Sequence, residues 1–207
     1  CWSVTLAATE TVSAGFKIDL SGDWATQWGT GASATSAVVN TTIGQAHINA
    51  GGNVPGNLTY AQVAGMKYSF RMKGDYTWWY RPYVIQATTN APVTVSGVTD
   101  NSGAAGTNAV TVTAALSGSP SGEQIYARWT TNAFASSALA TGAVAGVNAT
   151  MKIPGQPSGR TVKYYVLTSA MPTNRLVEDF DLCALRGNNA GGTNFSYVVG
   201  EAEPVFG

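Results

Sequence analysis

The aromatic side chains are the residues of this sequence with the clearest capacity for surface chemistry. Trp24 and Trp28 lie four positions apart around an expected turn, and Trp78, Trp79 and Tyr80 are consecutive. Exposed Trp and Tyr rings can stack on the apolar face of a sugar, whereas buried rings pack in a core. Since consecutive side chains of a strand point to opposite faces, Trp78 and Trp79 cannot both enter one core. We expect one of them to contact a second subunit, another domain or a carbohydrate.

Side chains for catalysis are scarce. The single histidine, His47, has no acidic or nucleophilic residue close to it in the sequence, and a Ser-His-Asp triad would have to use it. Zinc sites take three or four His, Cys or carboxylate ligands, for which this inventory is too small. No phosphate-binding or dinucleotide-binding glycine motif occurs. The sequence therefore predicts a protein that is not an enzyme and uses no cofactor.

Three acidic residues, Glu178, Asp179 and Asp181, lie almost side by side in the sequence. Neighbouring carboxylates cannot by themselves flank a glycosidic bond across a cleft. They could bind calcium together with Asn188 or Asn189. A solvated turn is the simpler interpretation, and we expect no metal here.

The composition limits the partners of the chain. Only 11% of the 207 residues are charged and the net charge is zero, while 44% are hydrophobic. Without a run of Lys or Arg to neutralise phosphates, the sequence argues against nucleic-acid binding. No apolar stretch approaches the roughly 20 residues of a membrane-spanning helix. Zero net charge favours association, so the chain itself is an expected partner.

The two cysteines, Cys1 and Cys183, lie near opposite ends of the sequence. Because the sequence begins with Cys rather than Met, we expect that the chain has been processed or trimmed, and removal of a secretory signal peptide would explain this. In an exported protein we expect Cys1 and Cys183 to form a disulfide. The alternatives are a lipid on Cys1, as in a bacterial lipoprotein, and two free thiols. The disulfide and the lipid both place the protein outside the cell or on its surface.

Four Asn-x-Ser/Thr sequons offer acceptor sites for glycans. They are at Asn40, Asn57, Asn148 and Asn194. Several such sequons arise by chance in a chain rich in Ser and Thr, so glycosylation stays an open alternative.

Alternation of apolar and polar residues dominates the sequence, and this pattern predicts β-strands. Trp2, Val4 and Leu6 alternate with small polar residues, and only residues 59–64 suggest a short helix. Because Pro92 disfavours a continuous strand, the chain is expected to divide near it. We predict an all-β protein of two tandem β-sandwich domains, immunoglobulin-like or jelly-roll-like, over residues 1–90 and 91–207.

The second half resembles a known module. The segments "IYARWTTNAFASSA", "IPGQPSGRTVKYY" and "NNAGGTNFSY" are similar to an immunoglobulin-like module of secreted proteins from Bacteroidota-type bacteria. This resemblance covers about residues 91–199. In the first half, "FKIDLSGDWATQWGTG" is similar to segments of outer-membrane starch-binding lipoproteins. Such modules accompany glycoside hydrolases or surface-sorting domains, and neither resemblance brings a catalytic residue.

Two hypotheses of function follow from these observations. The first is a structural subunit of an extracellular filament, assembled head to tail by strand exchange or domain stacking. Its donor strand would contain Trp2, Val4 and Leu6, because alternate side chains could fill pockets of a neighbour. The second is a secreted or surface-anchored protein that binds carbohydrate through exposed Trp residues. An accessory domain of a larger hydrolase is a third alternative.

Overall fold

A computed structural model of the chain describes residues 2–19, 25–31, 34–48, 55–73, 80–176 and 180–200. Strands dominate these residues, and the two α-helices among them have four residues each. The predicted all-β class is confirmed. Within the described part, no helix is both long and apolar enough to cross a membrane.

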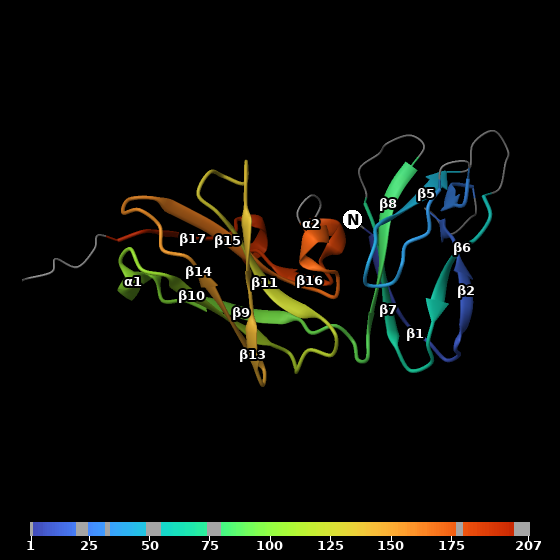
Figure 1. Cartoon of the computed structure of the whole chain (residues 1–207), viewed down its shortest axis with the longest axis horizontal. Helices are drawn as coiled ribbons and strands as arrows, with labels where there is room; N and C mark the ends of the chain where they lie inside the picture. Colours follow the sequence, from blue (N-terminus) through green and yellow to red (C-terminus); the bar gives the residue numbers. More distant parts are fainter. Residues whose placement is uncertain are drawn as a thin grey trace, which may run out of the picture. The chain divides into compact units, whose positions relative to one another are not determined.

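The chain forms two compact units, shown in Figure 1. The first comprises Cys1–Ala91 and Ala170–Ala184, and the second comprises Pro92–Ser169 and Leu185–Gly207. The first unit therefore includes a short segment, Ala170–Ala184, that was predicted to belong to the second domain over residues 91–207. In the sequence, this segment lies between two consecutive strands of the second unit.

The first unit contains a six-stranded sheet and a separate strand pair. In the larger sheet the strands follow the order β1-β7-β8-β5-β4-β3, and β2 pairs with β6. The strand pairs among the described residues of this unit are antiparallel. The elements are β1 (Trp2–Ala7), β2 (Val12–Phe16), β3 (Ile18–Asp19), β4 (Gln27–Gly29), β5 (Gly44–Ile48), β6 (Leu58–Gln62), β7 (Lys67–Met72), β8 (Tyr80–Thr88), the 3-10 turn η1 (Thr173–Arg175) and α2 (Phe180–Cys183).

Aromatic rings fill the core of the first unit. The ring of Phe16 from β2 lies 4.9 Å from that of Phe70 and 5.7 Å from that of Tyr83, between centroids. Tyr60 from β6 lies 5.2 Å from Phe70. Aromatic side chains bury large apolar areas, so these contacts hold the β2–β6 pair against β7 and β8.

The region 59–64, where a short helix was expected, is a strand instead. Residues Leu58–Gln62 form β6 and pair with β2. Leu58 is buried and Thr59 exposed, as in a strand with one face on a core. The helix prediction was wrong because tertiary pairing with β2 outweighs local propensity.

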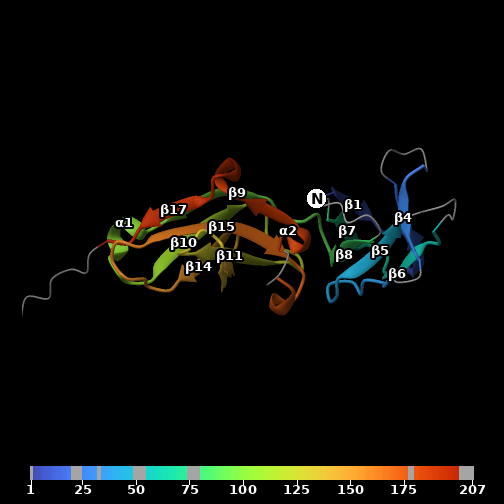
Figure 2. The same ribbon diagram turned by 90° about the horizontal axis from the view of Figure 1, so that it is seen from above.

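The second unit is built of two sheets with a common core. One sheet has the order β13-β14-β10-β9, and the other β12-β11-β15-β16 with β17 also paired to β15. Figure 2 shows β10 and β14 running side by side. The elements are β9 (Val95–Asp100), α1 (Ser102–Ala105), β10 (Val110–Leu116), β11 (Gln124–Thr130), β12 (Ala138–Thr141), β13 (Ala143–Ala145), β14 (Asn148–Ile153), β15 (Thr161–Ser169), β16 (Arg186–Asn188), the 3-10 turn η2 (Ala190–Gly192) and β17 (Phe195–Val198).

Alternate residues of the long strands form this core. In β10 the side chains of Val110, Val112 and Ala114 are buried and those between them are less so. Met151 from β14 and Tyr164 from β15 complete it from both sheets. Two packed antiparallel sheets with one apolar interior are the architecture of a β-sandwich, and this coarse class agrees with the sequence prediction.

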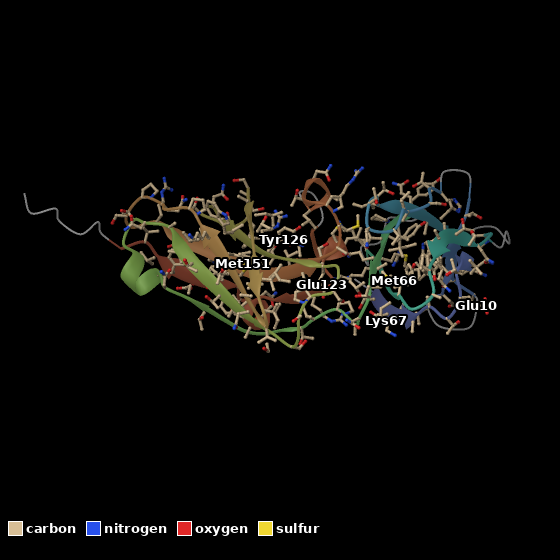
Figure 3. The ribbon with its side chains drawn as sticks, turned by 60° about the horizontal axis from the view of Figure 1, so that its bottom comes forward. Glu10, Met66, Lys67, Glu123, Tyr126 and Met151 are labelled. Carbon is tan, nitrogen blue, oxygen red and sulfur yellow. The ribbon has the colours of Figure 1, made fainter. Side chains whose placement is uncertain are left out.

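Two carboxylates stabilise the second unit, the buried one of Glu123 and the half-buried one of Asp100. Glu123, labelled in Figure 3, precedes β11 and is 2% exposed. Its carboxylate accepts hydrogen bonds from the backbone N–H groups of Val93 at 2.9 Å and Ser121 at 3.0 Å. The hydroxyl of Tyr164 donates to the carboxylate of Asp100 at 2.6 Å. Hydrogen bonds to ionised groups are among the stronger ones in proteins, so both carboxylates stabilise the segments that they join.

Candidate assembly edge and aromatic residues

Strand β1 forms one edge of the six-stranded sheet. Among the described strands it pairs only with β7, and Val4 lies opposite Phe70 while Leu6 lies opposite Tyr68. Phe70 and Tyr68 belong to the core, so Val4 and Leu6 are on the core side of the sheet. Even so, Val4 is 50% exposed and Leu6 is 53% exposed. The apolar side of β1 is therefore only half covered.

The opposite side of β1 is polar. Thr5 and Ser69 face each other across β1 and β7, with their hydroxyl oxygens 2.9 Å apart. The alternation seen in the sequence thus corresponds to two different faces of one strand. The predicted donor residues Trp2, Val4 and Leu6 lie in a strand that pairs within its own chain.

A pocket of about 240 Å³ opens beside β1. It is lined by residues from the two end strands of the sheet and from β7, namely Ser3, Val4, Ile18, Asp19, Phe70, Arg71 and Met72. Because β1 and β3 are the end strands of the sheet, a shared pocket means that the sheet curls and brings its two edges toward each other. The pocket is an apolar gap between these edges.

The aromatic candidates divide into those inside and those outside the described residues. Trp28 is 1% exposed, and the guanidinium carbon of Arg81 lies 4.3 Å from the centroid of its ring. The proposed surface role of Trp28 is corrected accordingly, because its ring packs in the core and against a cation. Trp24, Trp78 and Trp79 lie outside the described residues.

Tyr80 begins β8, and its ring lies 5.0 Å from that of His47 on β5, in an edge-to-face arrangement. The two residues are opposite each other in the β5–β8 pair. Both rings are partly buried. Their positions are explained by cross-strand packing, which is the ordinary way in which aromatic side chains stabilise a sheet.

The four sequons have different surroundings. Asn57 and Asn148 are exposed, and Asn194 is partly buried with a positive φ of 62°. Asn40 is committed to the fold, because its side chain donates to the carbonyl of Ala87 at 3.0 Å and accepts from the N–H of Ala87 at 2.7 Å. Whether any sequon is modified stays a prediction.

Cys183 is fully buried in α2, and its thiol donates a weak hydrogen bond to the carbonyl oxygen of Arg175 over 3.5 Å. Cys1 lies outside the described residues. The expected Cys1–Cys183 disulfide therefore stays a prediction.

The calcium alternative has little support from the residues that are described. The side-chain oxygen of Asn188 accepts from the N–H of Ala190 at 3.2 Å, and that of Asn189 accepts from the N–H of Gly192 at 3.0 Å. Glu178 and Asp179 lie outside the described residues. Across the described ranges, no three His, Cys, Asp or Glu side chains come together as a metal site.

The residue that sequence reasoning missed is Gln86 on β8. Its side chain is 0% exposed, its amide N–H donates to the carbonyl of Cys183 at 2.8 Å, and its amide oxygen accepts from the N–H of Ala170 at 2.7 Å. A polar residue in the run "YVIQAT" was the only sequence signal, and its partners lie more than 80 positions further along the chain.

Comparisons with protein-family models, with curated proteins and with solved structures found no match for this chain. The resemblances to the immunoglobulin-like module and to the starch-binding lipoproteins therefore stay predictions.

Proposed function

We propose that this protein is a non-enzymatic structural subunit of an extracellular bacterial filament, and that assembly adds a strand of a neighbouring copy at the edge of β1. One observation carries the proposal. The core-side residues Val4 and Leu6 of this edge strand are half exposed. Unpaired backbone groups beside uncovered apolar side chains favour pairing with another chain.

The sequence of β1 adds to this argument, because the strand lacks the usual protection of a sheet edge. Natural edge strands are commonly short or carry Lys, Pro or a bulge. The six residues of β1, WSVTLA, include no charge and no proline. At the other edge of the same sheet, β3 has only two residues, one of which is Asp19.

The six-residue edge strand of the second unit, β9, provides a contrast. It contains Gly97, and its pairing with β10 shifts register between Ala115 and Leu116. The side chain of Asn188 also donates to the carbonyl of Val95 at 3.2 Å. A bulge and a covering side chain are two devices that oppose edge pairing. The edge of β1 has neither among its described contacts.

Burial of β1 in an assembly would contribute a moderate free energy. Fully burying a Val or Leu side chain is worth about 1.5–3 kcal/mol, so covering the exposed halves of Val4 and Leu6 contributes roughly 2 kcal/mol. Backbone hydrogen bonds along the strand add to this. The pocket beside β1 offers space for side chains of an added strand.

Carbohydrate binding by Trp residues has less support from the described residues. Trp28 is buried, and Tyr80 packs against His47. Binding of a glycan by the monomer would be the result that favours this second hypothesis.

The test is the assembly state of the purified full chain. We expect electron microscopy to show filaments of wild-type protein and no filaments of Leu6→Lys, whose particles light scattering compares with the 21.4 kDa mass of one chain. A lysine at this position would place a charge on the face that must be buried.

The matched control is Val198→Lys, since Val198 is 64% exposed in the short strand β17 of the second unit. This variant should assemble like the wild type. Wild-type protein that stays monomeric at all concentrations would refute the proposal. Equal assembly of Leu6→Lys and wild type would refute the role of β1.

A further inference from the structure

The outer face of β8 is covered by a segment that is distant in sequence. From residue 83 onward, every residue of β8 is buried. Tyr83, Ile85 and Ala87 belong to the core cluster of the first unit. Val84, Gln86 and Thr88 therefore face the other way, and they too are buried. A strand that is buried on both faces needs a layer on each side of its sheet.

The second layer is the returning segment of the first unit, here called the arm and defined as residues 170–176 and 180–184. Its helix α2 lies against β7 and β8. Met171, Leu176 and Leu182 of the arm are each at most 2% exposed.

The side chain of Gln86 holds the arm by hydrogen bonds. Its amide bonds to the arm at two points, the N–H of Ala170 and the carbonyl of Cys183. Those residues are the first of the arm and the last but one. A buried amide without such partners would lose its hydrogen bonds to water with no compensation. Residues 1–91 alone consequently lack a layer that their sheet requires.

The connections of the arm belong entirely to the second unit. The arm follows β15 directly, and the N–H of Leu185, just after the arm, donates to the carbonyl of Thr168 in β15 at 2.7 Å. Residues 1–91 join the rest of the chain through the single connection Ala91–Pro92. In the sequence of each copy, the docking face on β8 precedes this connection and the arm follows it.

We propose that the outer face of β8 is an exchangeable docking surface, occupied either by the arm of its own chain or by the arm of a second copy. This inference rests on the proposed function and names one contact of the assembly. The contacts are the same in both cases, so only the connection at residues 91–92 distinguishes them. Reciprocal exchange between two copies closes a dimer, whereas exchange that passes from each copy to the next extends a head-to-tail chain.

Exchange should occur while the chains fold. The docked arm buries three large apolar side chains and two hydrogen bonds of Gln86, so it does not leave a folded unit readily. Chains that fold at high local concentration can accept the arm of a neighbour before their own arm docks.

The test uses two full-length variants, each with one introduced cysteine in a Cys1→Ser, Cys183→Ser background. One carries Gln86→Cys and the other Ala170→Cys. They are refolded together at high concentration, allowed to assemble and oxidised with diamide. A disulfide-linked dimer forms only where the arm of one copy docks on the face of the other. With random mixing, about a quarter of exchanged contacts combine the two cysteines.

The double variant Gln86→Cys, Ala170→Cys, refolded when dilute, is the positive control. Its intrachain disulfide would show that the arm still docks after substitution. Filaments that form without the linked dimer, with this control positive, would overturn arm exchange and leave the filament proposal standing. Monomers under every refolding condition would overturn both. If the control forms no disulfide, the wild-type chain with two different tags is refolded as a mixture, and absence of mixed dimers and longer species overturns exchange.

Discussion

Replacing Asn40 with alanine should destabilise the first unit by about 2–4 kcal/mol. Strand β5 pairs with β8 only from Tyr80 to Tyr83. Beyond Tyr83, Asn40 makes hydrogen bonds to β8 in place of a β5 residue. The N–H of Asn40 donates to the carbonyl of Ile85 at 3.0 Å, and its side chain bonds to both backbone groups of Ala87. One residue thus satisfies three backbone groups of the sheet.

The magnitude has two parts that can be separated. Each lost side-chain hydrogen bond costs about 0.5–1.5 kcal/mol. Asn40 also has a φ of 57°, a conformation that costs an alanine roughly 1–2 kcal/mol and that asparagine tolerates better. Asn40→Gly removes only the hydrogen bonds, and Asn40→Asp keeps the acceptor for the N–H of Ala87. We expect alanine to be most destabilising, glycine less so and aspartate least.

Urea unfolding followed by tryptophan fluorescence measures these differences, since Trp28 reports on the core of the first unit. Asn148→Ala is the matched control, because Asn148 belongs to an exposed sequon in the other unit and surface substitutions usually stay within about 0.5 kcal/mol. An Asn40→Ala protein as stable as this control would refute the role given to the side chain.

Two further predictions concern the second unit. Burial by itself would raise the pKa of Asp100, but hydrogen bonds from Ser102 and Tyr164 outweigh it and lower the pKa. The stabilising contribution of the ionised Asp100 carboxylate is therefore present above its unfolded-state pKa and lost as the pH falls through its folded-state pKa. Asp100→Asn should weaken this loss of stability with acid, measured as the free energy of unfolding in urea between neutral and acidic pH. An unchanged dependence of that free energy on pH would contradict the role of Asp100. Glu123→Ala should lower the free energy of unfolding by about 1–3 kcal/mol, because it removes the carboxylate that accepts from the buried N–H of Val93 and from the half-buried N–H of Ser121. An unchanged thermal melt would show that these groups find other partners.

Local patterns in the sequence were sufficient for the fold class. The alternation of Trp2, Val4 and Leu6 predicts a strand, and β1 occupies those residues. The same kind of alternation in β10 gives its buried face. Period-two patterns are set by the strand itself, so they can be read without knowing its partners.

Features that depend on distant partners could not be predicted in this way. Trp28 is buried by a strand that follows it by about fifty residues, with Arg81 over its ring. Asn40 has the sequence signature of a sequon, yet its amide is bound to Ala87. In both cases the residue type permits a surface role, and only the pairing of β8 with other strands decides against it.

The position of β1 changes how strand exchange should be viewed. A terminal strand with alternating apolar residues was expected to be a donor, but in this structure it pairs with β7 and forms one wall of an apolar pocket. An edge of this kind can accept a strand, and pairing of two identical edges closes after two copies. A filament therefore needs a second, different contact. The arm on the outer face of β8 provides one, because its two surfaces precede and follow the Ala91–Pro92 connection in the sequence. If the arm never exchanges, growth beyond a dimer requires another surface, such as the groove of Val12, Val38 and Val63.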